Sequence, residues 1–470
     1  MTIQDEKIIR YVGHHIVTEH EVDKTKKGWE KLVHIPYSET DLQVLEFTTK
    51  CKLRATTEDT PANIIYNEEL RILSSVSTAS NKDLANCVKM KSFQRIKSTL
   101  QRRRTKRRAR LPKSLKDVFL TEEQKRTTKG EKFIVFASPN NKILTFCSAI
   151  GLEILSKSRN WGADGTFYTA AKYYYQLYII SAYYLKRMIP CVWSLMHRRR
   201  VVEYNKVLKG LVKEAKKNKI KLKPATVMMD FEKAAMNAFL ENFPGVLIKL
   251  CLFHFSQSLF KHIVSLGFKD IYTKDAVIKE WFKKVFALAL VPLDDVDTLW
   301  AHIIITQPEL PNTTKFLDYV VHTYFEGDFA IKSWNHFETD GPRTNNNMEG
   351  YNSKLKKHVG TAHPNIHKAI EIFQQEEVLS CFKYFQADKG EKPPPRHKLV
   401  VFKDELLPAY KKMYLDKDIS FDTYLKYILP LYDLSLKKKL IKLLLVAQKR
   451  AQIRKINMIL DLILTNRKQK

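Results

Sequence analysis

The chain has 470 residues, and its 81 Lys and Arg against 50 Asp and Glu give a formal net charge of +31 at pH 7. This length allows two to four domains with a sizeable core. A positive charge of this size favours a polyanionic partner, nucleic acid above all, over a role in solubility alone. With only 14 Gly residues, an all-β fold is a poor fit.

Six cysteines are scattered along the chain without C-x-x-C pairs. This spacing predicts free thiols in a reducing compartment rather than a disulfide framework. The first residues carry no apolar signal core, and no stretch reaches the roughly 18 apolar residues that a membrane span needs. We therefore expect an intracellular, soluble protein with no membrane contact.

Residues 1–75 are expected to form a small N-terminal module. Residues 50–56 (K-C-K-L-R-A-T) resemble a fragment of a FLYWCH-type zinc finger. An earlier Cys and a later His-x-His are absent, so a tetrahedral zinc site cannot be assembled locally. The histidines of this part all precede Cys51: His14, His15, His20 and His34. We expect a degenerate, metal-free module with a β-rich, WRKY-like shape; the alternative is a module that still binds metal.

Residues 76–115 are predicted to form a basic helical linker. Its basic run contains Arg102, Arg103, Arg104, Lys106, Arg107, Arg108 and Arg110. Such a run is typical of a nuclear localisation signal, which would place the protein in the nucleus, or of an arm that contacts the DNA backbone. The alternative is a solvated linker helix.

Residues 116–258 are predicted to be the first part of an α/β core. A short strand pair at residues 132–136 and 142–146 leads into a helix at residues 149–157, and its simplest role is to cover the sheet. Three apolar runs at residues 162–170, 174–183 and 188–195 then predict a three-stranded meander.

Helical spacing at residues 201–217 follows the meander, and apolar runs at residues 225–230 and 246–252 flank a further helix. The predicted order of elements is therefore βββαβαβ. Trp161 and Phe167, on either side of Asp164 in the first strand, are expected to pack and hold the strand end rigid.

Residues 259–340 are rich in aromatic residues at helical spacing and predict a helical insertion. Residues 341–386 are predicted to return to the core and bring Glu349 on a helix. The proline run within residues 387–397 predicts a linker. Residues 398–470 are predicted to be a basic helical region that covers DNA, contacts a second copy in a homodimer, or packs back onto the core.

Three acids stand at the ends of separate elements of this core: Asp164, Asp230 and Glu349. A mixed sheet in this order, with acids at these points, is the layout of a ribonuclease H-like nucleotidyl transferase, in which the acids converge and hold two divalent cations. Carboxylate oxygens suit Mg²⁺, or Mn²⁺, better than a His and Cys cage would. Two such ions can hold the attacking and leaving oxygens of a displacement at phosphorus.

Several separated motifs resemble, in the same order, those of the Mutator-like element (MULE) transposases. They are residues 161–167 (W-G-A-D-G-T-F), 175–178 (Y-Q-L-Y), 229–235 (M-D-F-E-K-A-A), 251–258 (C-L-F-H-F-S-Q-S), 342–350 (P-R-T-N-N-N-M-E-G) and 362–366 (A-H-P-N-I). The resemblance implies Asp164, Asp230 and Glu349 as the catalytic and metal-binding triad, Cys251 and His254 as a C-x-x-H element, and an all-helical insertion.

Cys251 and His254 allow three interpretations: a structural or DNA-proximal role near the acids, metal ligation, or core packing. Zinc is possible in principle, but no second ligand pair stands at matching spacing. Near the third acid, Arg343, Lys354 and Lys357 are expected to contact DNA if the site does.

The resemblance and the three acids together predict a DDE-type transposase that cleaves double-stranded DNA at transposon ends and joins them to target DNA with Mg²⁺. One alternative is a domesticated, transposase-derived DNA-binding or transcriptional regulatory protein without catalytic activity. A second, weaker alternative is a nuclease of RNA metabolism or replication on the same fold.

Overall fold

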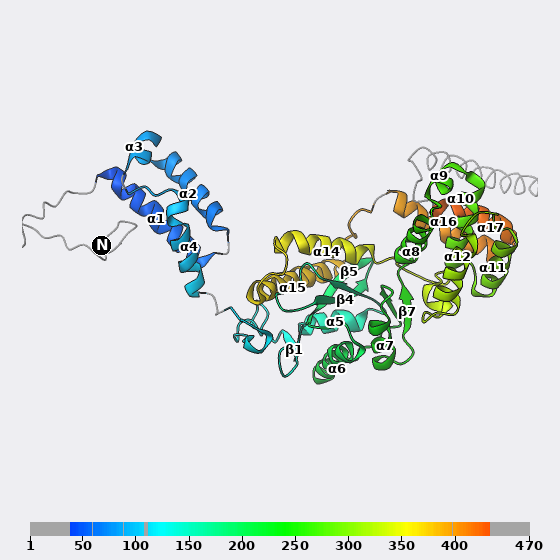
Figure 1. The fold of residues 1–470 in the computed structure, drawn as a ribbon. Coiled ribbons are helices and arrows are strands. Elements are labelled where there is room, and N and C mark those ends of the chain that lie inside the picture. Colours follow the sequence, from blue (N-terminus) through cyan, green and yellow to red (C-terminus); the bar gives the residue numbers. More distant parts are fainter. Residues whose placement is uncertain (1–37, 59, 88, 108–110, 397, 433–470) are drawn as a thin grey trace, which may run out of the picture. The chain divides into compact units, whose positions relative to one another are not determined.

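The computed structural model describes residues 38–58, 60–87, 89–107, 111–396 and 398–432 (Figure 1). The chain divides into two compact units, Met1–Arg110 and Leu111–Lys470. All six cysteines are free, as the sequence predicts. In the described part of the chain, no helix has the length and apolar character that crossing a membrane requires.

The described residues of the first unit form four helices, α1 (Glu39–Thr57), α2 (Ala62–Val76), α3 (Asn81–Asn86) and α4 (Phe93–Arg107). Helices α1 and α3 each begin with a capping box, in which a Ser side chain accepts the N–H of an Asp three residues later and the Asp accepts the Ser N–H in return. A small apolar core joins α1, α2 and α4, and Ile96 and Leu100 of α4 belong to it. Helix α4 is therefore part of this unit rather than a separate linker.

The predicted β-rich shape of the N-terminal module is wrong for residues 38–75, which are mainly helical. Phe47, Cys51 and Ala55 recur every four residues and are all buried, so they form one face of α1. Cys51 packs in the apolar core, which leaves the FLYWCH-like interpretation without support. His14, His15, His20 and His34 lie outside the described residues.

The second unit is built on a mixed seven-stranded sheet in the order β1-β2-β5-β4-β3-β6-β7. The strands are β1 (Ile134–Ala137), β2 (Ile143–Phe146), β3 (Asn160–Thr166), β4 (Gln176–Tyr184), β5 (Arg187–Met196), β6 (Thr226–Met229) and β7 (Leu247–Leu250). Strand β3 is antiparallel to β4 and parallel to β6, which is parallel to β7. The strand pair β1–β2 does not merely cover the sheet, because β2 pairs with β5 and extends it.

Helices cover both faces of this sheet. Figure 1 shows α5 (Ala149–Lys157), α6 (Val201–Lys217) and α7 (Lys233–Asn242) on one face and α14 (Asn346–Val359) and α15 (Ile366–Asp388) on the other. Two separate apolar clusters correspond to these faces. From β3 to β7 the order is strand, strand, strand, helix, strand, helix, strand, so the predicted βββαβαβ order is confirmed.

The predicted helical insertion is also confirmed, although its first helix begins before residue 259. It contains α8 (Leu252–Ser265), α9 (Lys269–Lys274), α10 (Ala276–Ala287), α11 (Val296–Ile305), α12 (Thr313–Val320) and α13 (Ile331–Trp334). The backbone N–H of Leu252 donates to the carbonyl of Arg343 at 2.9 Å, so the entry and the exit of the insertion are adjacent. The buried Trp281 and Trp334 belong to its core.

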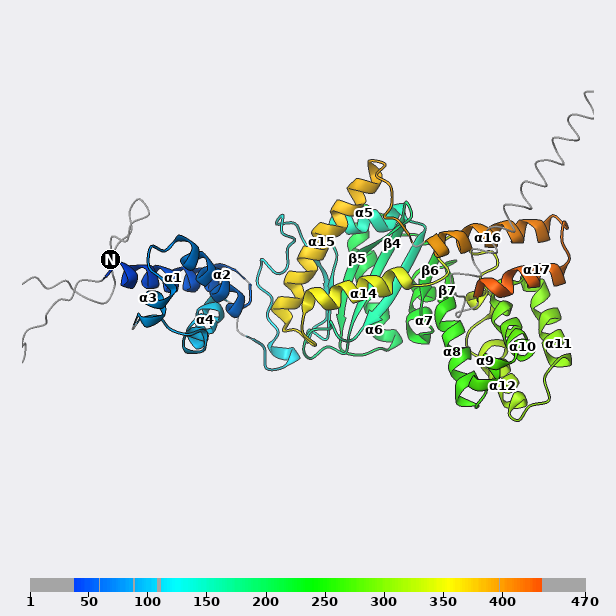
Figure 2. The same ribbon diagram turned by 90° about the horizontal axis from the view of Figure 1, so that it is seen from above.

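Helices α16 (Lys398–Leu415) and α17 (Phe421–Ile428) pack on the insertion at one end of the sheet (Figure 2). The buried Tyr424 donates from its hydroxyl to the carbonyl of Leu290 at 2.7 Å. Of the three interpretations of the C-terminal region, packing against the rest of the unit therefore applies to residues 398–432. Residues 433–470 lie outside the described residues. Short 3₁₀-helices at Leu115–Asp117, Leu288–Leu290, Leu293–Asp295 and Leu429–Tyr432 and a π-helical segment at Val321–Phe325 also belong to the unit.

Candidate active site

The three acids reach one place from three elements. Asp164 lies on β3, and Asp230 directly follows the parallel neighbour β6, so both belong to the carboxyl-terminal side of the same pair of strands. Glu349 stands in the first turn of α14. His254 connects two of the acids, because its Nδ1 lies 2.9 Å from Oδ1 of Asp230 and its Nε2 lies 3.7 Å from Oε1 of Glu349.

Two asparagines on the segment that carries Glu349 contact the other two acids. Nδ2 of Asn352 donates to Oδ2 of Asp164 at 2.6 Å, and Nδ2 of Asn345 donates to Oδ1 of Asp230. Asn345 is fully buried at the N-cap position of α14. The start of α14 therefore brings the third acid and also orients the first two. Neither asparagine was singled out from the sequence for this role, because the contacts join residues more than 100 positions apart.

Close packing of α14 on β3 fixes this arrangement. A Cβ placed on Gly162 would lie 2.6 Å from Sδ of Met348, the residue before Glu349. A side chain larger than that of glycine would have to displace the end of the Met348 side chain, so glycine favours this close approach. Gly162 thus helps to bring Glu349 to Asp164.

Burial and like charge dominate the electrostatics of Asp164. Burial, followed by the charge of Asp230, raises the pKa of Asp164 to about 7, and Glu349 adds to the rise. Asp230, followed by Cys251, raises the pKa of His254 to about 10. Carboxylates that crowd in this way favour a bound cation, and their hard oxygen atoms suit Mg²⁺ or Mn²⁺.

A polar network borders the acids and was not predicted. Arg199 pairs with both oxygens of Glu232 at 2.9 and 2.7 Å, and Tyr204 donates to the same carboxylate at 2.6 Å. Arg199 and Glu232 line a pocket together with Asp164 and Asp230. Glu232 lies only two residues after Asp230 in the M-D-F-E motif, and that spacing was the available signal.

The two aromatic residues that flank Asp164 differ in their environment. Trp161 is buried, and its indole N–H donates to the carbonyls of Leu155 and Ser158. Its predicted packing role is confirmed. Phe167 is 43% exposed, with Arg199 over its ring, so the prediction that it is a packing residue is wrong. It lies at the end of β3, where the sheet gives way to the pocket.

The predicted DNA-contacting residues of this unit differ in exposure. The guanidinium of Arg343 is mostly buried and lies 3.6 Å from Asp404, so it ties the core to α16 instead of facing solvent. Lys354 donates to both oxygens of the buried Glu376 at 2.9 Å. Lys357 is exposed on α14.

The basic run belongs to the first unit, Met1–Arg110. Arg102 and Arg103 are exposed on α4, and Arg104 donates to the carbonyl of Thr60. The backbone of Lys106 and Arg107 completes the helix, while Arg108 and Arg110 lie outside the described residues. A DNA-binding role for this run stays a prediction.

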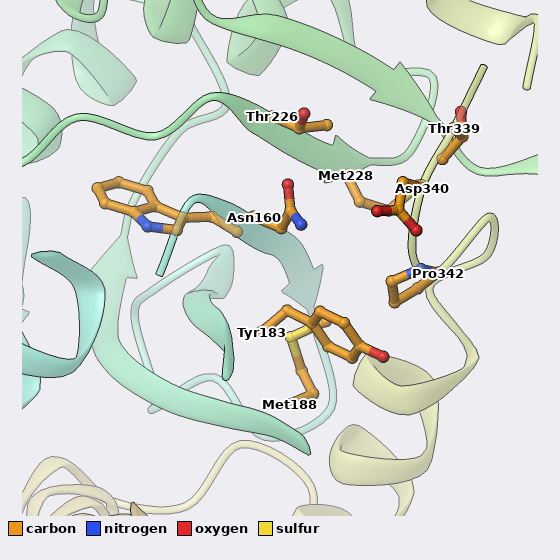
Figure 3. Close-up of a pocket in the computed structure, with 9 residues that line it drawn as sticks. Asn160, Tyr183, Met188, Thr226, Met228, Thr339, Asp340 and Pro342 are labelled. Atoms are coloured by element: carbon orange, nitrogen blue, oxygen red, sulfur yellow. The ribbon is translucent and has the colours of Figure 1, made fainter. Parts of the chain in front are cut away.

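A second hollow lies at the opposite ends of β3 and β6 (Figure 3). Asn160 and Thr226, the first residues of these strands, line it together with Met188 and Pro342. Asp340 is the one acid among its nine lining residues. Because it lacks the paired carboxylates found near Asp164, we do not assign it a catalytic role.

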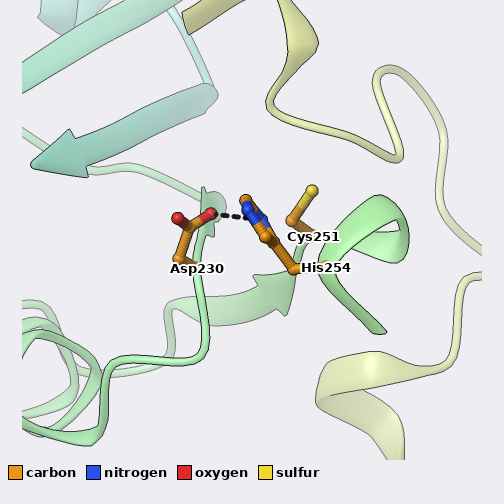
Figure 4. Close-up of side chains that lie close together, drawn as sticks. All are labelled: Asp230, Cys251 and His254. Atoms are coloured by element: carbon orange, nitrogen blue, oxygen red, sulfur yellow. Dashed lines mark ion pairs between the residues drawn. The ribbon is translucent and has the colours of Figure 1, made fainter. Parts of the chain in front are cut away.

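Cys251 and His254 lie with Asp230 in one group of potential metal ligands (Figure 4). Cys251 directly follows β7, and His254 is in the first turn of α8. Their ligand atoms and a carboxylate oxygen of Asp230 all lie within 4.8 Å of one another. The C-x-x-H element therefore lies beside Asp230, and its Cys251 is also fully buried, so all three interpretations stay open.

The part of the chain that carries these residues is similar to a known protein family. Residues 160–258 match the family model of the MULE transposase domain. The chain carries a MULE transposase domain. The matched part of the MULE domain runs from β3 into α8 and contains Asp164, Asp230, Cys251 and His254, while Glu349 lies beyond it. No curated protein matches the chain.

Proposed function

We propose that this protein is a DDE-type transposase with a ribonuclease H-like core, in which Asp164, Asp230 and Glu349 hold two Mg²⁺ ions. The MULE domain supports a transposase-related function and an interaction with DNA. One observation carries the catalytic proposal: the three acids lie at one site. His254 lies between Asp230 and Glu349. Asn345 and Asn352, from the segment that carries Glu349, donate to Asp230 and Asp164. The strand order β5-β4-β3-β6-β7 supports the ribonuclease H-like assignment.

The donor set fits the proposed metal. Three carboxylates supply hard oxygens. Burial is the main cause of the raised pKa of Asp164, and the negative charge of Asp230, which a divalent cation would neutralise, adds to it. Bound Mg²⁺ would stabilise the charge on the attacking and leaving oxygens at the scissile phosphate. The chain's own residues orient the acids: Asn352 fixes Asp164, and Asn345 fixes Asp230.

The proposed reaction has two stages at one site. Water first hydrolyses a phosphodiester at the transposon end and leaves a free 3′-hydroxyl. That hydroxyl then attacks a phosphodiester of target DNA, forms a new P–O bond to its phosphorus and displaces a 3′-hydroxyl of the target strand. The basic run around Arg102 is the reason to place the reaction in the nucleus. The proposed partner is double-stranded DNA. The proposed assembly is a homodimer.

The test uses the full chain with a supercoiled plasmid and with duplexes copied from the DNA that flanks the gene. Wild-type protein should cleave DNA only with Mg²⁺ or Mn²⁺. Asp164→Asn should reduce the rate at least 1,000-fold and leave DNA retention in a filter-binding assay unchanged. Asp340→Asn is the matched control, because Asp340 lies at the other end of the strands, and it should cleave normally.

Cleavage retained by Asp164→Asn, or cleavage by wild type in the presence of a chelator, would refute the catalytic proposal. Wild-type protein that binds the flanking DNA but never cleaves it would support the domesticated, non-catalytic alternative. Terminal inverted repeats around the gene distinguish these functions independently, because a mobile element keeps them.

A further inference from the structure

The group formed by Asp230, Cys251 and His254 contains a kind of ligand that Mg²⁺ chemistry does not use. Strands β6 and β7 are parallel neighbours, so the residues that follow them, Asp230 and Cys251, emerge at the same edge of the sheet. The first turn of α8 returns His254 to both of them (Figure 4). Thiolate sulfur and imidazole nitrogen favour zinc and similar transition metals over Mg²⁺.

The orientation of His254 matches that of a metal ligand. Its Nδ1 atom is buried and lies 2.9 Å from Oδ1 of Asp230. Its Nε2 atom faces Glu349 at 3.7 Å. Histidines that bind a metal through one nitrogen commonly direct the other toward a carboxylate, which fixes the ring.

The surroundings of Cys251 are also those of a ligand. The residue is fully buried, and its Sγ accepts the backbone N–H of Asn345 at 3.4 Å. The three ligand atoms lie within 4.8 Å of one another, whereas a tetrahedral zinc site needs separations of about 3.3–3.8 Å. Side-chain movements of about 1 Å would therefore close the site.

We propose that Asp230, Cys251 and His254 bind one Zn²⁺ ion, with Glu349 orienting the His254 ring. Three protein ligands leave the fourth position open to water. Metal binding displaces the thiol proton of Cys251 and one proton of the His254 imidazolium, and both are released to solvent. Because Asp230 is shared with the proposed Mg²⁺ site, Zn²⁺ at this position competes with Mg²⁺ for that carboxylate. The competition rests on the proposed function, but the binding does not.

The binding test uses Co²⁺ as the probe on full-length protein that has been stripped with a chelator. Wild type should bind one Co²⁺ at this group with a near-ultraviolet sulfur-to-cobalt charge-transfer band, and Zn²⁺ should bleach it. Cys251→Ser should abolish the band. Glu349→Gln should weaken Co²⁺ binding about 10–100-fold, as expected for the loss of a group that orients a ligand.

Matched controls separate this site from other thiols and from the catalytic proposal. Cys381→Ser and Cys51→Ser remove buried cysteines elsewhere and should keep the band. Asp164→Asn should also keep it, even though it abolishes Mg²⁺-dependent cleavage. Circular dichroism verifies that each variant is folded.

The absence of a charge-transfer band in wild type, or its persistence in Cys251→Ser, would overturn the zinc site. If the band behaves as expected and Zn²⁺ does not inhibit Mg²⁺-dependent cleavage, the site exists but does not compete for Asp230. If Asp164→Asn still cleaves, the catalytic proposal fails and the metal-binding result stands.

Discussion

Asn352 lies less than one helical turn beyond Glu349 on α14, and its amide is the direct partner of Asp164. Asn345, at the start of the same helix, plays the corresponding part for Asp230. A single helix thus carries one acid and holds two others by hydrogen bonds. The amide groups fix which carboxylate oxygens remain available to a cation.

Replacing Asn352 with Ala removes the donor to a mostly buried carboxylate. We expect the Mg²⁺ concentration required for half-maximal cleavage to rise about 10-fold or more, while the free energy of unfolding falls by about 1–2 kcal/mol. Ser353→Ala, at the exposed neighbouring position, is the control and should change neither. An Asn352→Ala protein with an unaltered Mg²⁺ requirement would show that the amide does not orient Asp164.

Two glycines near the site should respond to Ala in opposite directions. Gly162→Ala places a methyl group 2.6 Å from Sδ of Met348, and overpacking of this kind destabilises by about 1–3 kcal/mol. Gly350 is in α14 with nothing within 4 Å of its Cβ position, so Gly350→Ala should stabilise by about 0.5–1 kcal/mol. Urea unfolding measures both effects.

A double-mutant cycle tests the cause of the Gly162 effect. If Met348 is the obstacle, Met348→Ala should cost less stability in the Gly162→Ala background than in wild type. Additive losses would mean that the methyl group clashes with something else.

At the scale of elements, the strands of the core were predictable because buried strands read as short apolar runs bounded by turns. Helix α6 was predictable because its apolar residues, such as Tyr204 and Leu208, recur at helical spacing. The N-terminal helices were missed because the resemblance of residues 50–56 to a zinc finger was given more weight than the four-residue recurrence of Phe47, Cys51 and Ala55. The pairing of β2 with β5 was missed because short strands carry no signal for their partners.

The three acids could be selected from the sequence because each ends or begins an element within a recognisable motif. The polar partners could not. Asn352 contacts Asp164, and Tyr204 and Arg199 contact Glu232. These partners are distant in the sequence, and only the fold brings them together. Arg343 looked like a DNA contact, yet it pairs with Asp404, a residue of the C-terminal region that the sequence gave no reason to place nearby.

The connection after the insertion contains a buried histidine that should make stability depend on pH. His336 is fully buried, with Nε2 2.8 Å from the carbonyl of Leu250, and burial lowers its pKa to about 3. The unfolded chain takes up the proton near pH 6.5, while the folded chain does not. The contribution is therefore complete above pH 6.5 and is lost on acidification toward pH 3, by about 1.4 kcal/mol per pH unit.

Urea unfolding of the full chain between pH 7.5 and 4.5 measures this slope. His336→Gln removes the titrating group and should flatten the acid side of the curve. His322→Gln is the control, because His322 is largely exposed and should leave the wild-type slope unchanged. Equal slopes in all three proteins would mean that His336 takes up its proton in the folded state.

At the scale of the whole molecule, the two units are built on separate cores. The first unit buries Phe47, Cys51, Ile65 and Leu100 among α1, α2 and α4. A group of ion pairs supports the packing, since Arg54 contacts Glu58, Glu68 and Glu69 at 2.7–2.8 Å. We infer that this unit does not need the sheet in order to fold.

Residues 34–110 expressed alone should therefore show a helical circular dichroism spectrum and a cooperative thermal transition. In the native fragment, the thiol of Cys51 should react with a thiol reagent at least 10-fold more slowly than that of Cys87, which is partly exposed. A non-cooperative transition, or equal reaction rates for the two thiols, would show that the second unit is needed to complete this core.

The hydrogen bond between Leu252 and Arg343 has a consequence for how such a protein can change over time. The helical insertion leaves the core and returns to it at adjacent residues, so the distance between its two ends does not depend on its length. Closing a longer loop costs only a little more entropy. Helices can accordingly be added to the insertion or lost from it while Asp164 and Glu349 keep their positions. Size and surface can diversify there, and the chemistry can stay the same.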